Sequence, residues 1–488
     1  MHPSRREVLA TAASLLASAC TRPAPRRETA EADVRYYLDR INEVDRFVNS
    51  IIELNPDAMR IATELDAERR AGKRRGPLHG MAILVKDNID TADRMKTTAG
   101  SLALVDAPPP KADAPVVARL REAGAVILGK TNLSEWANFR SSLSTSGWSG
   151  RGGQTRNPYA LDRNPSGSSS GSGAAAAAGL CWAAVGTETD GSIVSPSSIN
   201  GIVGIKPTVG VLSAAGIIPI SHVQDTAGPM APSVTAATQL LSAMSGGAFS
   251  VERALNPRSL DKARIGVARS LFGRHPGVLA VTEKSLDALR KAGAVLVDPV
   301  DLPPDSEYGD AEMTAMLYEF KHGLNLYLAA RGGPVQSLAA VIAFNEREAA
   351  REMPHFKQEL LEQAQAKGPL TEKAYLDARD KARRTATSGI DRALDKHGLA
   401  AIVAPTGGLS WVTDYVNGDH YNQSCSTDPA VAGYPHITVP AGFVGGLPVG
   451  LSFFGRAHSD ATLIGLAYAF EQATHARREP RFLAHAAS

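Results

Sequence analysis

Short apolar runs that alternate with helical patterns constrain the fold of this chain most strongly. Five runs have the length of buried strands: Gly80–Val85, Gly124–Gly129, Ala263–Val267, Ala401–Pro405 and His436–Pro440. Apolar residues recur at helical spacing from Ala30 to about Arg75, and a helical pattern at Pro115–Ala123 separates the first two runs. Because strands that alternate with helices pack as layers, we predict the α/β class.

Residues 310–400 differ from the rest of the chain because they are charged, helix-forming and nearly free of strand patterns. No linker is long enough to separate domains, so we predict one large domain over 28–488, with 310–400 as a helical subregion. Apolar residues make up 43% of the chain and charged residues 21%, as in ordinary globular proteins. The net charge of +2 argues against a nucleic-acid partner, and the lack of a long apolar run argues against a membrane-spanning helix.

Residues 1–27 have the pattern of a bacterial export signal followed by a polar tether. The twin arginines Arg5 and Arg6 precede the mostly apolar run Val8–Ala17, and small residues lead up to Cys20. We therefore predict an exported, periplasmic protein. Two kinds of processing stay open: cleavage before Cys20 would leave a lipid-anchored cysteine, whereas Ala17–Ala19 would serve as an ordinary signal-peptidase site.

The chain has three cysteines, which are too few and too widely separated for a disulfide framework or a metal cluster. Beyond the export signal only Cys181 and Cys425 remain. Cys181 lies among small and apolar residues, as a core residue would. The polar stretch around Cys425 indicates no clear role for its thiol.

Residues 141–173 form a long polar segment that ends in the Ser- and Gly-rich run Pro165–Gly173. The run argues against a phosphate-binding loop because it lacks a closing Gly-Lys-Ser/Thr and the glycine spacing of a dinucleotide-binding loop. A flexible linker would not lead directly into the Ala-rich helix that we expect at Ala174–Leu180. Gly167–Gly171 matches G-x-S-x-G, but that nucleophile motif follows a strand and Asn157–Pro165 has the composition of a loop.

A fourth interpretation joins this run to two other segments. Thr187–Ser192 is a second Gly-bearing turn, and Lys86 ends a predicted apolar strand. A serine needs a base to become a good nucleophile, and neither Ser/Gly loop supplies a histidine. A buried lysine could be that base because desolvation disfavours its charged form, and backbone N–H groups of the turn could bind an oxyanion.

Together these segments resemble the amidase signature family, and within it the chain is most similar to bacterial peptide amidases. The resemblance extends through most of the chain beyond the export signal. It rests on the following segments: Leu84–Asn88, Gly129–Trp136, Gly167–Gly171, Gly186–Ile193, Gly204–Thr208, Asp225–Pro229, Tyr318–His322 and Gly446–Leu451. The combination is highly specific, although each segment alone would be only moderately so.

The resemblance implies a mixed β-sheet core covered by helices and a Ser–Ser–Lys triad. Ser192 would be the nucleophile, Ser168 a bridging serine in a cis peptide bond with Gly167, and Lys86 the base. Ser169 would support the site through hydrogen bonds. The oxyanion would be bound by four backbone amides, those of Thr189, Asp190, Gly191 and Ser192.

Three positions depart from the common family pattern. Ser170 and Asp190 stand where many relatives have Gly, and Val194 stands where many have Arg after Ser-Ile. Because Val194 closely follows Ser192, we expect its side chain to contact substrate as an apolar wall, which favours neutral acyl groups. The alternative is that Val194 is core packing and that Lys321 or Arg331 supplies a basic clamp for a carboxylate.

The resemblance implies an exported serine hydrolase that cleaves carboxamides of peptides or hydrophobic acids through an acyl-enzyme, releasing ammonia or an amine. It implies no metal or organic cofactor and a small-molecule or peptide amide as the partner. Two other functions stay open. One is a component of a transfer-RNA-dependent amidotransferase, which the export signal, the near-neutral charge and Val194 oppose. The other is a periplasmic binding protein that has lost catalysis.

Overall fold

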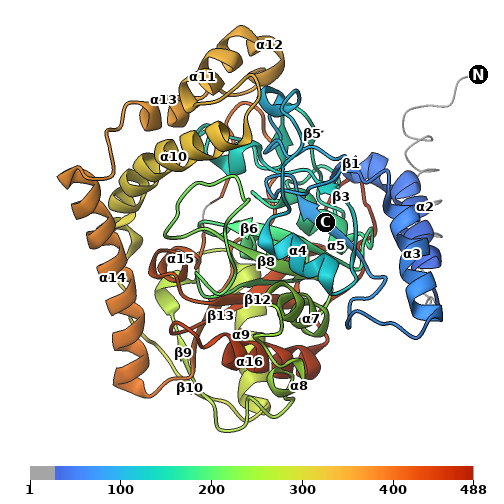
Figure 1. Ribbon diagram of the computed structural model, residues 1–488. Helices are drawn as coiled ribbons and strands as arrows, with labels where there is room; N and C mark the ends of the chain where they lie inside the picture. Colours follow the sequence, from blue (N-terminus) through green and yellow to red (C-terminus); the bar gives the residue numbers. More distant parts are fainter. Residues whose placement is uncertain (1–27, 422, 487–488) are drawn as a thin grey trace, which may run out of the picture.

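A single 11-stranded sheet runs through the molecule and mixes parallel with antiparallel pairs (Figure 1). The computed structural model describes residues 28–421 and 423–486. The strand order is β1-β3-β2-β6-β8-β7-β12-β13-β11-β9-β10. The strands are β1 (Ile51–Leu54), β2 (Ala82–Lys86), β3 (Val126–Thr131), β6 (Ala183–Glu188), β7 (Val203–Lys206), β8 (Thr226–Ala231), β9 (Arg264–Val267), β10 (Val295–Val297), β11 (Ala401–Pro405), β12 (His436–Val444) and β13 (Leu447–Phe454), beside a separate pair, β4 (Trp148–Ser149) and β5 (Gly153–Gln154).

Helices cover both faces of this sheet, which confirms the predicted α/β class and mixed core. The α-helices are α2 (Ala30–Val48), α3 (Ala58–Arg70), α4 (Pro115–Glu122), α5 (Ser170–Ala177), α6 (Val194–Ile199), α7 (Val234–Met244), α8 (Val251–Ala254), α9 (Pro276–Lys291), α10 (Gly309–Arg331), α11 (Leu338–Arg347), α12 (Ala349–Glu352), α13 (Glu359–Gln365), α14 (Lys373–His397), α15 (Thr427–Ala432) and α16 (Asp460–Thr474). Short 3-10 turns lie at Leu102–Leu104, Glu135–Asn138, Arg269–Leu271 and Asp305–Glu307.

The predicted apolar runs correspond to β2, β3, β9, β11 and β12. In β2, Ile83 and Val85 pack into one core, whereas Ala82 and Leu84 pack into the other. A strand buried on both faces has a continuous apolar sequence, which is why these runs were recognisable.

The prediction of helices throughout Ala30 to Arg75 is wrong at β1. Helix α2 ends at Val48 and is followed by Asn49, which adopts a left-handed conformation. The Asp45 carboxylate accepts hydrogen bonds from the backbone of Ser50 and Ile51. The chain then pairs antiparallel with β3 at the sheet edge. An edge strand of four residues is too short to show a period of its own.

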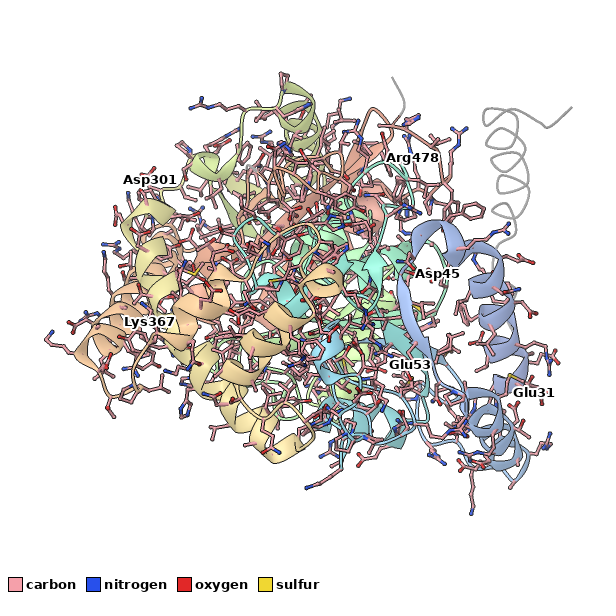
Figure 2. All side chains as sticks on the ribbon, turned by 90° about the horizontal axis from the view of Figure 1, so that it is seen from above. Glu31, Asp45, Glu53, Asp301, Lys367 and Arg478 are labelled. Carbon is pink, nitrogen blue, oxygen red and sulfur yellow. The ribbon has the colours of Figure 1, made fainter. Side chains whose placement is uncertain are left out.

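The helical region α10–α14 lies at the opposite side of the molecule from α2 and α3 (Figure 1). In Figure 2, Lys367 and Glu31 mark these two ends. The residues 310–400 are helical as predicted, and α10 packs against both α13 and α14. Among the described residues, no helix has the length and apolar character that crossing a membrane requires.

Candidate active site

Parallel pairing of β2 with β6 brings the ends of these two strands together. Lys86 is the last residue of β2, and Thr187 lies near the end of β6. The fully buried Lys86 Nζ donates to Ser168 Oγ at 2.8 Å and to Thr187 Oγ1 at 2.8 Å. The structure therefore brings together the lysine and the first serine that the sequence singled out.

Ser168 is fully buried and follows a cis peptide bond with Gly167, as the family resemblance implied. The helix expected at Ala174–Leu180 begins earlier, at Ser170, and ends at Ala177. Because Ser170 Oγ donates to the Ser166 carbonyl at 2.6 Å, the unusual serine at position 170 has a hydrogen-bond partner at the start of the helix.

Ser192 lies in the turn between β6 and α6, and 9% of its surface is exposed. Its carbonyl accepts the Ser169 N–H at 3.2 Å, while Ser169 Oγ donates to the Thr187 carbonyl at 3.0 Å. Gly191 in the same turn has φ +75°, a conformation that favours glycine. Ser169 thus ties the Ser168 loop to the Ser192 turn, in keeping with its expected supporting position.

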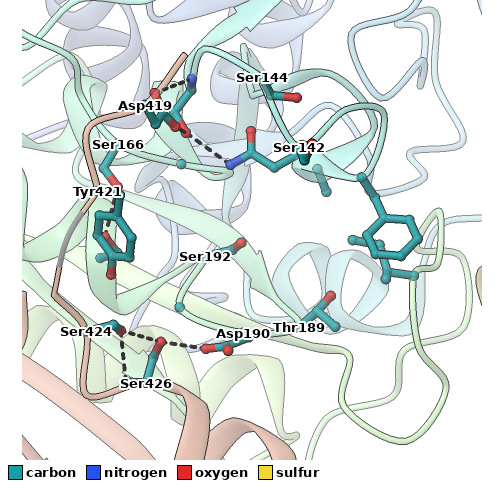
Figure 3. Close-up of a pocket in the computed structure, with 18 of the residues that line it drawn as sticks. Ser142, Ser144, Ser166, Thr189, Asp190, Ser192, Asp419, Tyr421, Ser424 and Ser426 are labelled. Atoms are coloured by element: carbon teal, nitrogen blue, oxygen red, sulfur yellow. Dashed lines mark hydrogen bonds between the residues drawn. The ribbon is translucent and has the colours of Figure 1, made fainter. Parts of the chain in front are cut away.

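Ser192 opens into a cavity of about 360 Å³, which we call the Ser192 cavity (Figure 3). Phe139, Ile220, Met313, Met316 and Leu360 supply apolar side chains, and Thr189, Asp190 and Gly191 lie beside Ser192. Among the described lining residues the charged ones are Asp190 and Asp419, with no Lys, Arg or His. The described chain also holds no cluster of three or more His, Cys, Asp or Glu residues suited to a metal ion.

Burial lowers the pKa of Lys86 to about 7, against the opposing effects of the Asp225 and Glu188 charges. The cause is desolvation, which disfavours the ammonium form. At neutral pH a large fraction of Lys86 is therefore a neutral amine. Such an amine keeps one lone pair and can accept a proton.

Two carboxylates beside the turn, the buried Glu188 and the partly buried Asp225, were not singled out from the sequence. Glu188 Oε2 accepts the N–H groups of Ile193 and Val194, at 2.7 and 3.0 Å. Asp225 accepts the Thr189 hydroxyl at 2.6 Å, and burial raises its pKa to about 7. Glu188 lies within the segment Gly186–Ile193 and Asp225 begins the segment Asp225–Pro229, both quoted above. An acidic residue in such a segment was the sequence signal that could have identified them.

Asp190 carries a carboxylate where many relatives have no side chain. It is paired: the hydroxyl groups of Ser426 and Thr427 donate to its two oxygens, at 2.5 and 2.9 Å. Ser426 immediately precedes α15 and Thr427 is its first residue. The segment at 424–427 therefore packs against the turn at 189–192 and holds the Asp190 side chain (Figure 3). The carboxylate is held away from the turn's backbone amides by these bonds.

Val194 is fully buried at the start of α6 and is absent from the described lining of the Ser192 cavity. The first helical turn directs Ser195 to the cavity instead. Lys321 Nζ donates to the carbonyls of Gln365 and Lys367, and Arg331 pairs with Asp90 at 3.2 Å. The structure thus brings neither the expected apolar wall nor either alternative basic clamp to the cavity.

Segments far away in the sequence complete the cavity, and sequence patterns gave no signal for them. Met313 and Met316 come from α10, Leu360 comes from α13, and Trp411 and Tyr421 come from the segment before α15.

Cys181 and Cys425 are both buried free thiols. Cys425 Sγ lies 3.8 Å from His436 Nε2, inside the protein.

Comparison with known proteins supports the interpretation of this geometry. The model of the amidase family matches residues 32–464. A probable amidase from Arabidopsis thaliana is 40% identical over 94% of this chain and 90% of its own length. The crystal structure of native peptide amidase from Stenotrophomonas maltophilia is 49% identical, with a TM-score of 0.88 over 93% of this chain and 95% of that one.

A second solved structure, of a peptide amidase in complex with the competitive inhibitor chymostatin, is 49% identical with a TM-score of 0.89 over 93% of this chain and 96% of that one. A glutamyl-tRNA(Gln) amidotransferase component from Symbiobacterium thermophilum is 34% identical over 90% of this chain and 92% of its own. The chain therefore belongs to the amidase family and is an amide-hydrolysing enzyme similar to peptide amidases.

Proposed function

We propose that this enzyme is exported and hydrolyses the C-terminal carboxamide of peptides through an acyl-enzyme on Ser192, releasing ammonia. One observation carries the proposal: a buried lysine with a pKa near 7 contacts Ser168, and the next residue, Ser169, bonds the carbonyl of Ser192, which lines a cavity. The same residues are the triad expected from the family resemblance. Thr187 holds the lysine from the other side.

The proton path follows from the donors and acceptors of a neutral Lys86. The ammonium form donates to Ser168 Oγ at 2.8 Å. In the neutral form, two N–H bonds serve Thr187 Oγ1 at 2.8 Å and the Thr187 carbonyl at 3.4 Å, which leaves the lone pair to accept the Ser168 hydroxyl. Ser168 passes its proton to Lys86 and takes the proton of Ser192. The Ser192 oxygen then bonds to the carbonyl carbon of the substrate.

The oxyanion formed by this attack needs N–H donors beside Ser192, and the turn from Thr189 to Ser192 supplies backbone amides there. When the carbon–nitrogen bond breaks, the proton returns through Ser168 to the leaving nitrogen, which departs as ammonia. A water molecule then attacks the ester of Ser192 by the same proton path. The products are a carboxylate and the free serine.

The cavity favours a neutral acyl group because its described lining combines apolar side chains with two carboxylates and no cation. Asp190 and Asp419 would repel a carboxylate on the substrate, since like charges in a poorly solvated site cost energy. A peptide amidase that is 49% identical to this chain binds the competitive inhibitor chymostatin, which supports a peptide as the substrate class. The same charges oppose an amidotransferase role for the chain.

We expect a peptide that ends in leucinamide to be hydrolysed at least tenfold more efficiently than its counterpart that ends in glutamic acid α-amide. The charged side chain would meet the Asp190 and Asp419 carboxylates without a compensating cation. Ammonia release gives kcat/KM for each substrate, and the glutamine α-amide controls for size. Equal or faster hydrolysis of the glutamic acid substrate would contradict the proposal.

The export part of the proposal rests on residues 1–27, which include Arg5, Arg6 and Cys20. All of these residues lie outside the part of the chain that the structure describes. We expect the variant Arg5→Lys/Arg6→Lys to accumulate in the cytoplasm of a bacterium with twin-arginine export, because that receptor reads the arginine pair. Cell fractionation followed by an activity assay measures this, and Arg22→Lys is the matched control. Unchanged periplasmic activity of the double variant would rule out this route.

A further inference from the structure

Exposed apolar side chains gather at the mouth of the Ser192 cavity. Of the ten large apolar side chains that are exposed in the described chain, two, Met313 and Tyr421, line the cavity. Tyr421 and four others lie on two segments at its edge, and we call these five the apolar rim: Leu143, Val412, Tyr415, Val416 and Tyr421. The remaining four belong to β1, β10, α10 and α14.

Contacts between the two segments hold the rim together. Leu143 lies between Ser142 and Ser144, which both line the cavity. Thr145 Oγ1 donates to the Asp414 carbonyl at 2.6 Å. Gly418 approaches so closely that a Cβ there would come within 2.8 Å of the Leu143 carbonyl oxygen. The segments 141–146 and 411–421 therefore form one continuous edge of the cavity.

The rim side chains face solvent although they are large and apolar. Val416 is 85% exposed and Leu143 is 58% exposed. Apolar side chains that cluster in this way around a cavity are typical of binding surfaces, whereas single exposed ones need no explanation. Figure 3 shows Tyr421 at the cavity that contains Ser192, together with Ser142 and Ser144, the two residues on either side of Leu143 in the sequence.

We propose that the apolar rim is a subsite for apolar side chains of the peptide upstream of the scissile carboxamide. This inference rests on the proposed function. A cavity of about 360 Å³ is near the lower limit for ligand pockets, so it accommodates only the end of a peptide. With the carboxamide at Ser192, the rim offers the preceding residues of the peptide an apolar path out of the cavity. An extended chain advances about 3.4 Å per residue, so residues upstream of the one that carries the carboxamide would contact the rim.

The test uses the double variant Leu143→Ser/Val416→Ser and a matched control. Leu326→Ser is that control, because Leu326 is 61% exposed on α10 and is absent from the described cavity lining. Three substrates are compared: acetyl-leucinamide, and acetylated tripeptide amides that end in leucinamide and carry either two valines or two serines upstream. Ammonia release gives kcat and KM for each substrate.

We expect the double variant to lower kcat/KM about tenfold for the divaline substrate, mainly through KM, and less than twofold for the other two. A factor of ten corresponds to about 1.4 kcal/mol, which burial of about two methylene groups supplies. The wild-type enzyme and Leu326→Ser should both prefer the divaline substrate to the diserine one. An equal loss on all three substrates, or no wild-type preference, would overturn the rim subsite while leaving amide hydrolysis intact.

Two further measurements address other occupants of the rim. Sedimentation with phosphatidylglycerol vesicles would overturn the proposal if wild-type enzyme bound and the double variant did not. Light scattering would overturn it if a wild-type dimer became a monomer in the double variant. If acetyl-leucinamide were hydrolysed but neither tripeptide amide were, both the peptide substrate and the rim subsite would be wrong.

Discussion

Replacement of Ser192 by Ala should lower kcat for carboxamide hydrolysis by about 10⁴-fold or more, because no acyl-enzyme can then form. Removal of the nucleophile from a serine hydrolase has effects of this size. The fold should persist, since the backbone carbonyl of residue 192 still accepts the Ser169 N–H. Ammonia release measures turnover, and circular dichroism with thermal unfolding tests the fold.

Ser195→Ala is the matched control, because Ser195 is another serine that lines the same cavity and bonds Ser166 Oγ at 2.8 Å. We expect this variant to keep at least a tenth of the activity. Adding Ser168→Ala to Ser192→Ala should cause little further loss, since residues that act as a unit are not additive. Substantial turnover by Ser192→Ala would show that another group is the nucleophile.

The strands that could be predicted from the sequence are those buried on both faces. The β2 and β3 segments have continuous apolar sequences because helices cover each side of the sheet there. β1 was missed because an edge strand of four residues lies between two helices and has no distinct period. The family motif Gly446–Leu451 overlaps the first half of β13, but it was not predicted as a strand because Pro448 and Gly450 are uncommon inside strands.

The site could be predicted where chemistry depends on local motifs. Lys86, Ser168 and Ser192 each lie in a short segment with a recognisable pattern, and the structure places these segments side by side. The position of the Val194 side chain depended instead on the direction of the first turn of α6, which turns it inward. The cavity walls from α10 and α13 depend on packing between distant segments, which no local pattern encodes.

Replacement of Lys86 by Met should reduce kcat/KM about 10³-fold or more while the protein stays folded. Methionine has a similar length and no proton-accepting group, so Ser168 would lose its base. The variant should also be more stable than the wild type at pH 7. Its thioether pays no desolvation penalty in a site where burial lowers the pKa of the lysine from 10.5 to about 7.

The size of this stability difference depends on pH. Between pH 7 and 10.5 the unfolded lysine binds a proton that the folded one does not, so lowering the pH through this range destabilises the wild type. The gain in thermal stability of Lys86→Met over wild type should therefore be larger at pH 7 than at pH 10. Thermal unfolding at the two pH values measures it, and an equal gain would contradict a lysine that is neutral in the folded enzyme.

The pH profile of the wild-type enzyme should reveal the same group. We expect kcat/KM to rise with pH through a midpoint of about 7, because only the neutral amine can take the proton of Ser168. Asp225→Asn distinguishes the lysine from the carboxyl that titrates nearby. Removal of the negative charge lowers the pKa of Lys86 further, so the midpoint should shift to lower pH. If the transition vanished in this variant, or if wild-type activity rose only near pH 10, Lys86 would not be the base.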